Sequence, residues 1–383
     1  MSGLTRRTFL ATTAALSTAW ALPTELLGSA LAAPPKPSTA PSTLQQTIRQ
    51  QITPVRDKYR LLAGAPGEPH LVRNDLMNAD PDPKRVSRRR SLLYAGHFSD
   101  IHLIDAQSPA RLEPLEAVAA EKMADASRPQ ETLTTNVLSE MVTAVADLRF
   151  SPVTGAPMAT TLVTGDAADS HASTELQWYV NLLDGTTMKP NSGGPEYEGV
   201  QAWPEATYVW QPDHPEGTAF GDYGFPRIPG LLNAAVSQEV TSPGLPVPWY
   251  AVYGNHDTTF MGNLKVDSWI QQWAVNDRKC STAEASVSNM MLDGWVSESS
   301  ALHRFVNNLN VKLGFHSGVR SVTPDPERKL FDQLGFMQIH MNTKPVPGPI
   351  GHGFTQHNLD TNETWWKADI SPQFRVFGLD TCN

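Results

Sequence analysis

Residues 91–105 read SLLYAGHFSDIHLID. The apolar run over 91–98 predicts a β-strand, and the polar residues that follow include Asp100 and His102, two positions apart. Side chains at this spacing on an extended chain project from the same face. The segment therefore predicts a strand whose end presents a carboxylate and an imidazole together.

Two later segments repeat this arrangement. Residues 159–164, ATTLVT, predict a strand followed by GDAAD (165–169), and residues 247–253, VPWYAVY, predict a strand followed by GNHD (254–257). Taken singly, each motif has a plainer explanation, such as a turn at the glycines or a helix N-cap at Asp169. Their joint position after successive strands favours one shared site.

Helices are expected between these strands. Apolar residues recur at helical spacing over 133–150 and over 173–183. Strands and helices in alternation are typical of α/β folds, where the carboxyl ends of the strands collect ligands. We therefore expect an α/β chain of βαβαβ order with all three polar motifs at one edge of the sheet.

The ordered motifs Asp-x-His, Gly-Asp-x-x-Asp and Gly-Asn-His-Asp resemble those of the calcineurin-like metallophosphoesterase superfamily. The resemblance covers residues 90–260 closely and the remainder loosely. It implies a layered β-sandwich flanked by helices, with long loop insertions. It also implies hydrolysis of a small-molecule phosphoester by a hydroxide that two metal ions activate.

The resemblance implies a role for each motif residue. Asp100 and His102 would bind the first metal, Asp166 would bridge both metals, and Asn255 would bind the second metal. Carboxylate, imidazole and amide donors suit divalent or trivalent Fe, Mn, Zn or Co.

Two further residues would act in catalysis. His256 would protonate the leaving alkoxide, while Asp169 would fix the tautomer of His256 and raise its pKa.

The family pattern also requires a later histidine and a closing Gly-His-x-His. Gly351-His352-Gly353-Phe354 begins like that motif but has no second histidine, so we disfavour His352 and His357 as ligands. Residues 374–381, FRVFGLDT, predict a fresh core strand just before the sequence ends at Asn383. We expect a domain truncated in its C-terminal half, with weak metal binding and impaired hydrolysis.

The N-terminal residues differ in character from the rest. Arg6 and Arg7 precede a modestly apolar run and small residues near Ala33, which is the layout of a twin-arginine signal peptide over 1–33. We expect the Tat export machinery as a partner and an extracellular, periplasmic or cell-envelope location. The apolar run is too short for a stable membrane anchor, since a bilayer needs ~20 residues.

The remaining chain divides by composition. A Pro/Ser/Thr-rich linker is expected over 34–45, an N-terminal extension over 46–90 and the main domain over 91–383. An aromatic insertion over 185–246 would be either a lid over the site or a surface embellishment. The alternative to an enzyme is a catalytically inactive exported module that binds a ligand through this insertion.

Charge and cysteine content set further limits. A net charge of −9 argues against nucleic acid as a general partner, because the phosphate backbone is bound through excess Lys and Arg. The basic run over 84–90 is either a solvated surface or an aid to anion steering. Cys280 and Cys382 could form one disulfide but cannot form a metal cluster.

Overall fold

The computed structural model describes residues 36–51, 60–69, 71, 73–76, 78–117, 126–282, 318–343 and 347–382. The expected signal peptide lies outside these described residues, as do His303 and His316.

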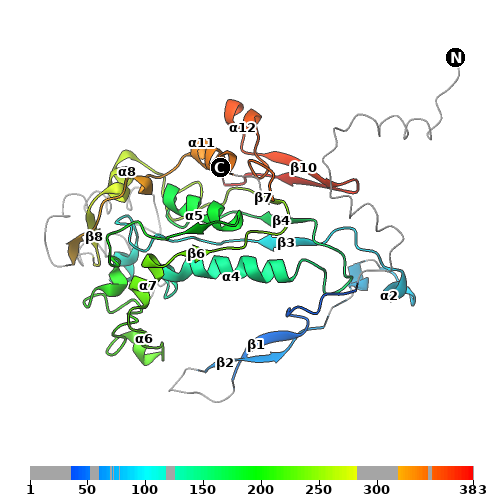
Figure 1. Cartoon of the computed structure of the whole chain (residues 1–383), viewed down its shortest axis with the longest axis horizontal. Helices are drawn as coiled ribbons and strands as arrows, with labels where there is room; N and C mark the ends of the chain where they lie inside the picture. The colour runs from blue at the N-terminus through cyan, green and yellow to red at the C-terminus, as the bar shows by residue number, and fades with distance from the viewer. Residues whose placement is uncertain are drawn as a thin grey trace.

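The central sheet consists of three parallel strands. They are β3 (Ala95–Phe98), β4 (Thr160–Val163) and β7 (Trp249–Ala251), hydrogen-bonded in the order β3-β4-β7. Each lies inside its predicted segment and is shorter than predicted: β3 begins later, and β4 and β7 are shorter at both ends. The α/β class is confirmed at this level, and Figure 1 shows the three strands at the centre of the molecule.

Two helices connect these strands. Helix α4 (Thr134–Asp147) joins β3 to β4, α5 (Ser173–Leu183) follows β4, and the two helices pack against each other. The buried positions of α4 are Thr135, Leu138, Ser139 and Val142, which form one face of a helix. Leu138 and Val142 join Leu176 of α5 and Trp249 of β7 in the main core cluster. Burying each such aliphatic side chain stabilises the fold by roughly 1.5–3 kcal/mol.

The remaining elements surround this unit. They are β1 (Gln46–Gln50), β2 (Leu62–Pro66), η3 (Asn74–Leu76), α2 (Arg85–Arg88), η4 (Glu131–Leu133), β5 (Thr187–Met188), η5 (Val200–Ala202), α6 (Ala219–Asp222), α7 (Leu231–Ser237), β6 (Val240–Thr241), α8 (Ser268–Val275), β8 (Arg278–Cys280), β9 (Val319–Ser321), η6 (Pro326–Arg328), α11 (Gln333–Met341), α12 (Gln356–Thr361), β10 (Trp366–Ser371) and β11 (Phe374–Gly378).

The N-terminal extension contains a β-hairpin of β1 and β2 that projects from the rest of the chain (Figure 1). Ile48 and Leu62 on this hairpin are exposed. The basic run that follows is surface structure, since Lys84, Arg88 and Arg90 are all exposed. Its role in anion steering stays a prediction.

The prediction of a core strand over 374–381 was wrong. Strand β11 ends at Gly378 and pairs only with β10, in an antiparallel hairpin that leaves Phe374 and Phe377 exposed. Its apolar residues resemble those of a buried strand in sequence, but Trp366 of β10 is the buried core member of this hairpin, and Ala368 and Val376 pack against the core from partly buried positions. The Nε1–H of Trp366 donates to the Ala251 carbonyl at 2.7 Å.

The insertion over 185–246 has structure of its own. Strands β5 and β6 pair near its two ends, and η5, α6 and α7 lie between them. Tyr197, Trp203 and Trp210 are buried, so these aromatic rings pack the insertion and are not exposed to a ligand. None of the described helices has the length and apolar character needed to cross a bilayer.

Candidate metal centre

Backbone hydrogen bonds join the loops after β3 and β4. Asp100 N–H donates to the Gly165 carbonyl at 3.2 Å, and His102 N–H donates to the Asp166 carbonyl at 2.8 Å. The parallel pairing of the strands therefore continues into the loops, which brings the first two motifs side by side.

The carboxylate of Asp257 ties the third loop to the second. This buried group accepts hydrogen bonds from the backbone N–H groups of Ala167, Ala168 and Gly254 at 3.0 to 3.2 Å. Burial is the main effect on its acidity and raises the pKa of Asp257 to about 7, against the opposing effect of these bonds. Gly254 is required at the same contact, because a Cβ there would overlap the backbone and carboxylate of Asp166.

Three of the motif residues adopt left-handed backbone conformations. The φ angles of Asp100, His102 and Asp166 are 55°, 48° and 53°. Non-glycine residues adopt this region at a cost, and such strain concentrates at functional sites. These three residues lie just after the carboxyl ends of β3 and β4, and positive φ also occurs at Asn78, His171, Met261, His352 and Asn362.

The three loops bring together His102, Asp166 and His256. Their potential ligand atoms all lie within 4.8 Å of one another, which is close enough for one metal ion to contact all three. Asp166 is 6 % exposed, and the two histidines are partly buried. The site is therefore partly accessible to solvent.

The hydrogen bonds of His102 define its tautomer. Its Nδ1 lies 3.0 Å from Oδ1 of Asp169, and an ionised carboxylate only accepts hydrogen bonds. Nδ1 therefore carries a proton and Nε2 is the atom that faces the site, 3.5 Å from Oδ2 of Asp166. Burial disfavours the charged ring, but the hydrogen bond to Asp169 and the charges of Asp169 and Asp166 outweigh burial and raise the pKa of His102.

His256 is oriented by the main chain instead. Its Nδ1 donates to the backbone carbonyl of Asp169 at 2.7 Å, while the Asp169 carboxylate lies 3.7 Å away. The expectation that Asp169 would fix the tautomer is met through the carbonyl and not through the side chain. The expected rise in pKa was wrong: burial outweighs the charge of Asp169 and lowers the pKa of His256.

Asp100 and Asn255 lie at the exposed rim of the site. Asp100 accepts a hydrogen bond from the Ser99 hydroxyl, and Asn255 Nδ2 donates to the Gly262 carbonyl at 3.3 Å. The Asn255 orientation leaves Oδ1, the atom that would bind metal, without a hydrogen-bond donor among the described residues. Asp100 is not part of the compact group, so its predicted role needs a side-chain rotation.

The later histidines lie elsewhere. His352 stacks on Trp249 at 3.4 Å, near the start of β7, and its Nδ1 lies 3.0 Å from Nδ1 of His340. His357 is exposed and pairs with Glu363. Neither His352 nor His357 joins the site, as the sequence predicted.

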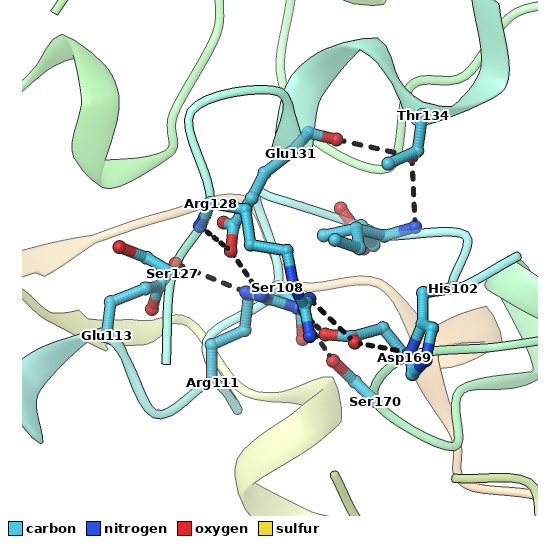
Figure 2. Close-up of polar contacts among 12 residues, drawn as sticks. His102, Ser108, Arg111, Glu113, Ser127, Arg128, Glu131, Thr134, Asp169 and Ser170 are labelled. Atoms are coloured by element: carbon cyan, nitrogen blue, oxygen red, sulfur yellow. Dashed lines mark hydrogen bonds and ion pairs between the residues drawn. The ribbon is translucent and has the colours of Figure 1, made fainter. Parts of the chain in front are cut away.

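Sequence reasoning missed a buried ionic network beside the site (Figure 2). Arg111 is 1 % exposed and its guanidinium contacts Asp169, Glu131 and Glu113. Lys279, also buried, contacts Glu113 at 3.1 Å. The only sequence signal was the presence of Arg111 and Glu113 in the otherwise apolar stretch PARLEPL.

This network fixes the charge of Asp169. Burial alone would raise its pKa, but the hydrogen bond from His102 and the charges of Arg111 and Arg128 hold the pKa of Asp169 well below its usual range. Burial raises the pKa of Glu131 to about 7, even though Arg111 opposes the rise. Asp169 is therefore the group that stays ionised beside the histidines.

Two clefts lie away from these residues. One of about 710 Å³ lies between residues 215–227 of the insertion and Arg60 and Leu61, and another of about 660 Å³ lies between α5, η6 and α11. Neither is lined by His102, Asp166 or His256. Chemistry and not cavity size identifies the candidate site.

Comparison of the chain with protein-family models, with curated proteins and with solved structures gives no match.

Proposed function

We propose that this protein is a metal-dependent phosphoester hydrolase related to the calcineurin-like metallophosphoesterases. The observation that carries the proposal is the convergence of His102, Asp166 and His256 from three successive strand ends into one group. The layered β-sandwich of that superfamily is part of the same proposal.

The residues fit a transition-metal site. Imidazole, carboxylate and amide donors are typical ligands of Zn, Mn, Fe or Co, and the hydrogen bond at Nδ1 of His102 turns its Nε2 toward the site. The hydrogen bond at Nδ1 of His256 likewise turns its Nε2 toward the site, where the ring would serve as a proton donor and not as a ligand. Asp166 would be a ligand of both metal ions. Asp100 and His102 would be the other ligands of the first metal ion, and Asn255 would bind the second. When bound, such metals supply the positive charge that stabilises the attacking and leaving oxygens of a phosphoester.

The side chains have separate tasks in this proposal. Asp169 holds the His102 ring through Nδ1, and Asp166 is fixed because its Oδ1 accepts the His256 backbone N–H at 2.9 Å. His256 delivers a proton from Nε2 to the leaving oxygen. Its lowered pKa makes the protonated form a readier donor.

Export is the second part of the proposal. Arg6 and Arg7 before an apolar run support export by the twin-arginine route, to the periplasm, the cell envelope or the medium.

The alternative function is ligand binding without catalysis. The cleft of about 710 Å³ beside Tyr223 and Phe225 supports it, because its volume falls within the ~300–1,000 Å³ of small-molecule pockets. The hydrolase requires metal at the candidate centre for turnover, whereas the ligand-binding module does not.

The test is hydrolysis of p-nitrophenyl phosphate and bis(p-nitrophenyl) phosphate after chelation and after re-addition of Mn²⁺, Zn²⁺, Co²⁺ or Fe²⁺. We expect turnover that returns with metal and is absent in Asp166→Asn, with unchanged circular dichroism. Failure of every metal to give turnover above that of Asp166→Asn would favour the binding module.

A further inference from the structure

Two arginines contact the same carboxylate beside the candidate metal centre. Arg111 Nη1 donates to Oδ2 of Asp169 at 3.1 Å, and Arg128 Nη1 donates to Oδ1 at 3.0 Å. The Arg111 side chain is fully buried, whereas the Arg128 side chain is 29 % exposed. Figure 2 shows the Asp169 carboxylate between these guanidinium groups and the His102 ring.

The two arginines are held differently. Arg111 is fixed within the protein, because it also contacts Ser170 and Glu131 at 2.9 and 2.8 Å. Arg128 is anchored by its backbone N–H, which donates to Glu131 at 3.0 Å, and its only described side-chain acceptor is Asp169. Arg111 is therefore part of the packed interior, while Arg128 has Asp169 as its specific partner.

Oδ1 of Asp169 lies between two histidines. It is 3.0 Å from Nδ1 of His102 and 3.7 Å from Nδ1 of His256. Arg111 donates only to the other oxygen, Oδ2. Arg128 donates to Oδ1, the same oxygen that accepts from Nδ1 of His102.

We propose that Arg128 is a positioning residue for the first metal ligand, His102. It acts through Asp169, which sets the orientation of the His102 ring and presents Nε2 to the metal. The inference rests on the metal centre of the proposed function. Outer-shell partners of this kind change metal affinity by about 10–100-fold when they are removed.

A purely electrostatic role makes a different prediction. If Arg128 only balanced the charge of Asp169, any cation at this position would serve, and Arg128→Lys would equal the wild type. If Arg128 positions Oδ1, the planar guanidinium matters and the flexible ammonium of lysine replaces it only in part.

The experiment measures Co²⁺ affinity in the full chain for wild type, Arg128→Gln and Arg128→Lys. We expect affinity about 10–100-fold weaker in Arg128→Gln and an intermediate value in Arg128→Lys. The control is Arg227→Gln, an exposed arginine near Glu216 on the insertion, which should bind as the wild type does. Wild-type affinity in Arg128→Gln, or in Arg128→Lys, would overturn the proposal.

A second readout does not depend on metal. In the metal-free protein, the Nδ1–H proton of His102 should give a slowly exchanging downfield NMR signal that is lost or broadened in Arg128→Gln. An unchanged signal would overturn the positioning role. A wild type that binds no Co²⁺ but loses this signal in the variant would refute the metal centre and leave the role of Arg128 in place.

Discussion

Oδ1 of Asp169 lies 3.0 Å from Nδ1 of His102, although the two residues belong to the loops of different strands. This contact turns the His102 ring so that Nε2 faces Asp166. Asp169, which the sequence motif placed in catalysis, therefore orients His102, a ligand of the proposed metal centre. The main-chain carbonyl of the same residue orients His256.

His256→Gln tests the role of that histidine. If His256 is the proton donor and not a ligand, His256→Gln should lower kcat and keep metal affinity, because the proposed ligands Asp100, His102, Asp166 and Asn255 are unchanged. The loss should be smaller for p-nitrophenyl phosphate than for phenyl phosphate, since p-nitrophenolate leaves without a proton. Metal analysis of the purified variant is the check, and loss of metal would assign His256 as a ligand instead.

Arg111→Leu should be strongly destabilising. It leaves the buried carboxylates of Asp169 and Glu131 without their shared cation, at a cost of about 3–5 kcal/mol. The loss should be smaller at pH 6 than at pH 8, because Glu131 has a pKa of about 7 and can take up a proton. Urea denaturation at both pH values measures this.

The matched control is Arg375→Ala, which breaks an exposed ion pair with Asp369 on the β10–β11 hairpin. It should leave the unfolding free energy nearly unchanged, since exposed pairs contribute little. Equal losses in the two variants would contradict the structural difference between them.

Acid should destabilise the fold through His340 and His352. Burial lowers the pKa of both histidines below 6.5, so the folded state keeps them neutral where the unfolded chain is protonated. Among the charged groups of the described residues, Asp184 alone opposes the shift, through its 3.2 Å contact with His352. The stabilisation from the neutral histidines is therefore fully present above pH ~6.5. As the pH drops below that value, the free energy of unfolding decreases by up to ~1.4 kcal/mol per pH unit for each histidine.

His340→Phe checks this pH dependence. Its Nε2 is buried without a hydrogen-bond partner in the described structure, but the substitution also removes the contact of its Nδ1 with His352. The check is therefore the pH dependence of the unfolding free energy and not its value at neutral pH. The slope of unfolding free energy against pH between 5 and 6.5 should decrease. His357→Gln, at an exposed position, should keep the wild-type slope, and an unchanged slope in His340→Phe would refute this assignment.

Asp257→Ala should separate the second and third loops. It removes the acceptor of backbone N–H groups from Ala167, Ala168 and Gly254, and each donor left unpaired in the interior costs about 1–3 kcal/mol. We expect a lower melting temperature together with weaker metal binding. Unchanged metal affinity in the folded variant would show that the loops hold their positions without this carboxylate.

The sequence predicted the elements whose signals are local. The helix predicted over 173–183 has those bounds in the structure, because its apolar residues mark a helical face and Gly185 follows its end. The strands were placed by apolar runs that end at polar motifs. Convergence of the motifs followed from the parallel order of the strands.

The remainder depends on contacts between distant segments. Arg111 and Lys279 are 168 residues apart in the sequence, and both contact Glu113. No sequence spacing predicts such a contact. The sequence prediction placed the exposed hairpin of β10 and β11 in the core. An apolar strand has the same local sequence pattern whether it lies in the core or at the surface. The pKa of His256 depends on how deeply the ring is buried, which the motif does not encode.

Metal binding tests the central claim most directly, because it needs no knowledge of the substrate. The measurement is a Co²⁺ titration of the full chain, followed by visible absorption, for wild type, Asp166→Asn, His102→Gln and the control His357→Gln. We predict saturable binding in the wild type and the control, and its loss in the two site variants. Equal binding in wild type and Asp166→Asn, or none in either, would contradict the metal centre.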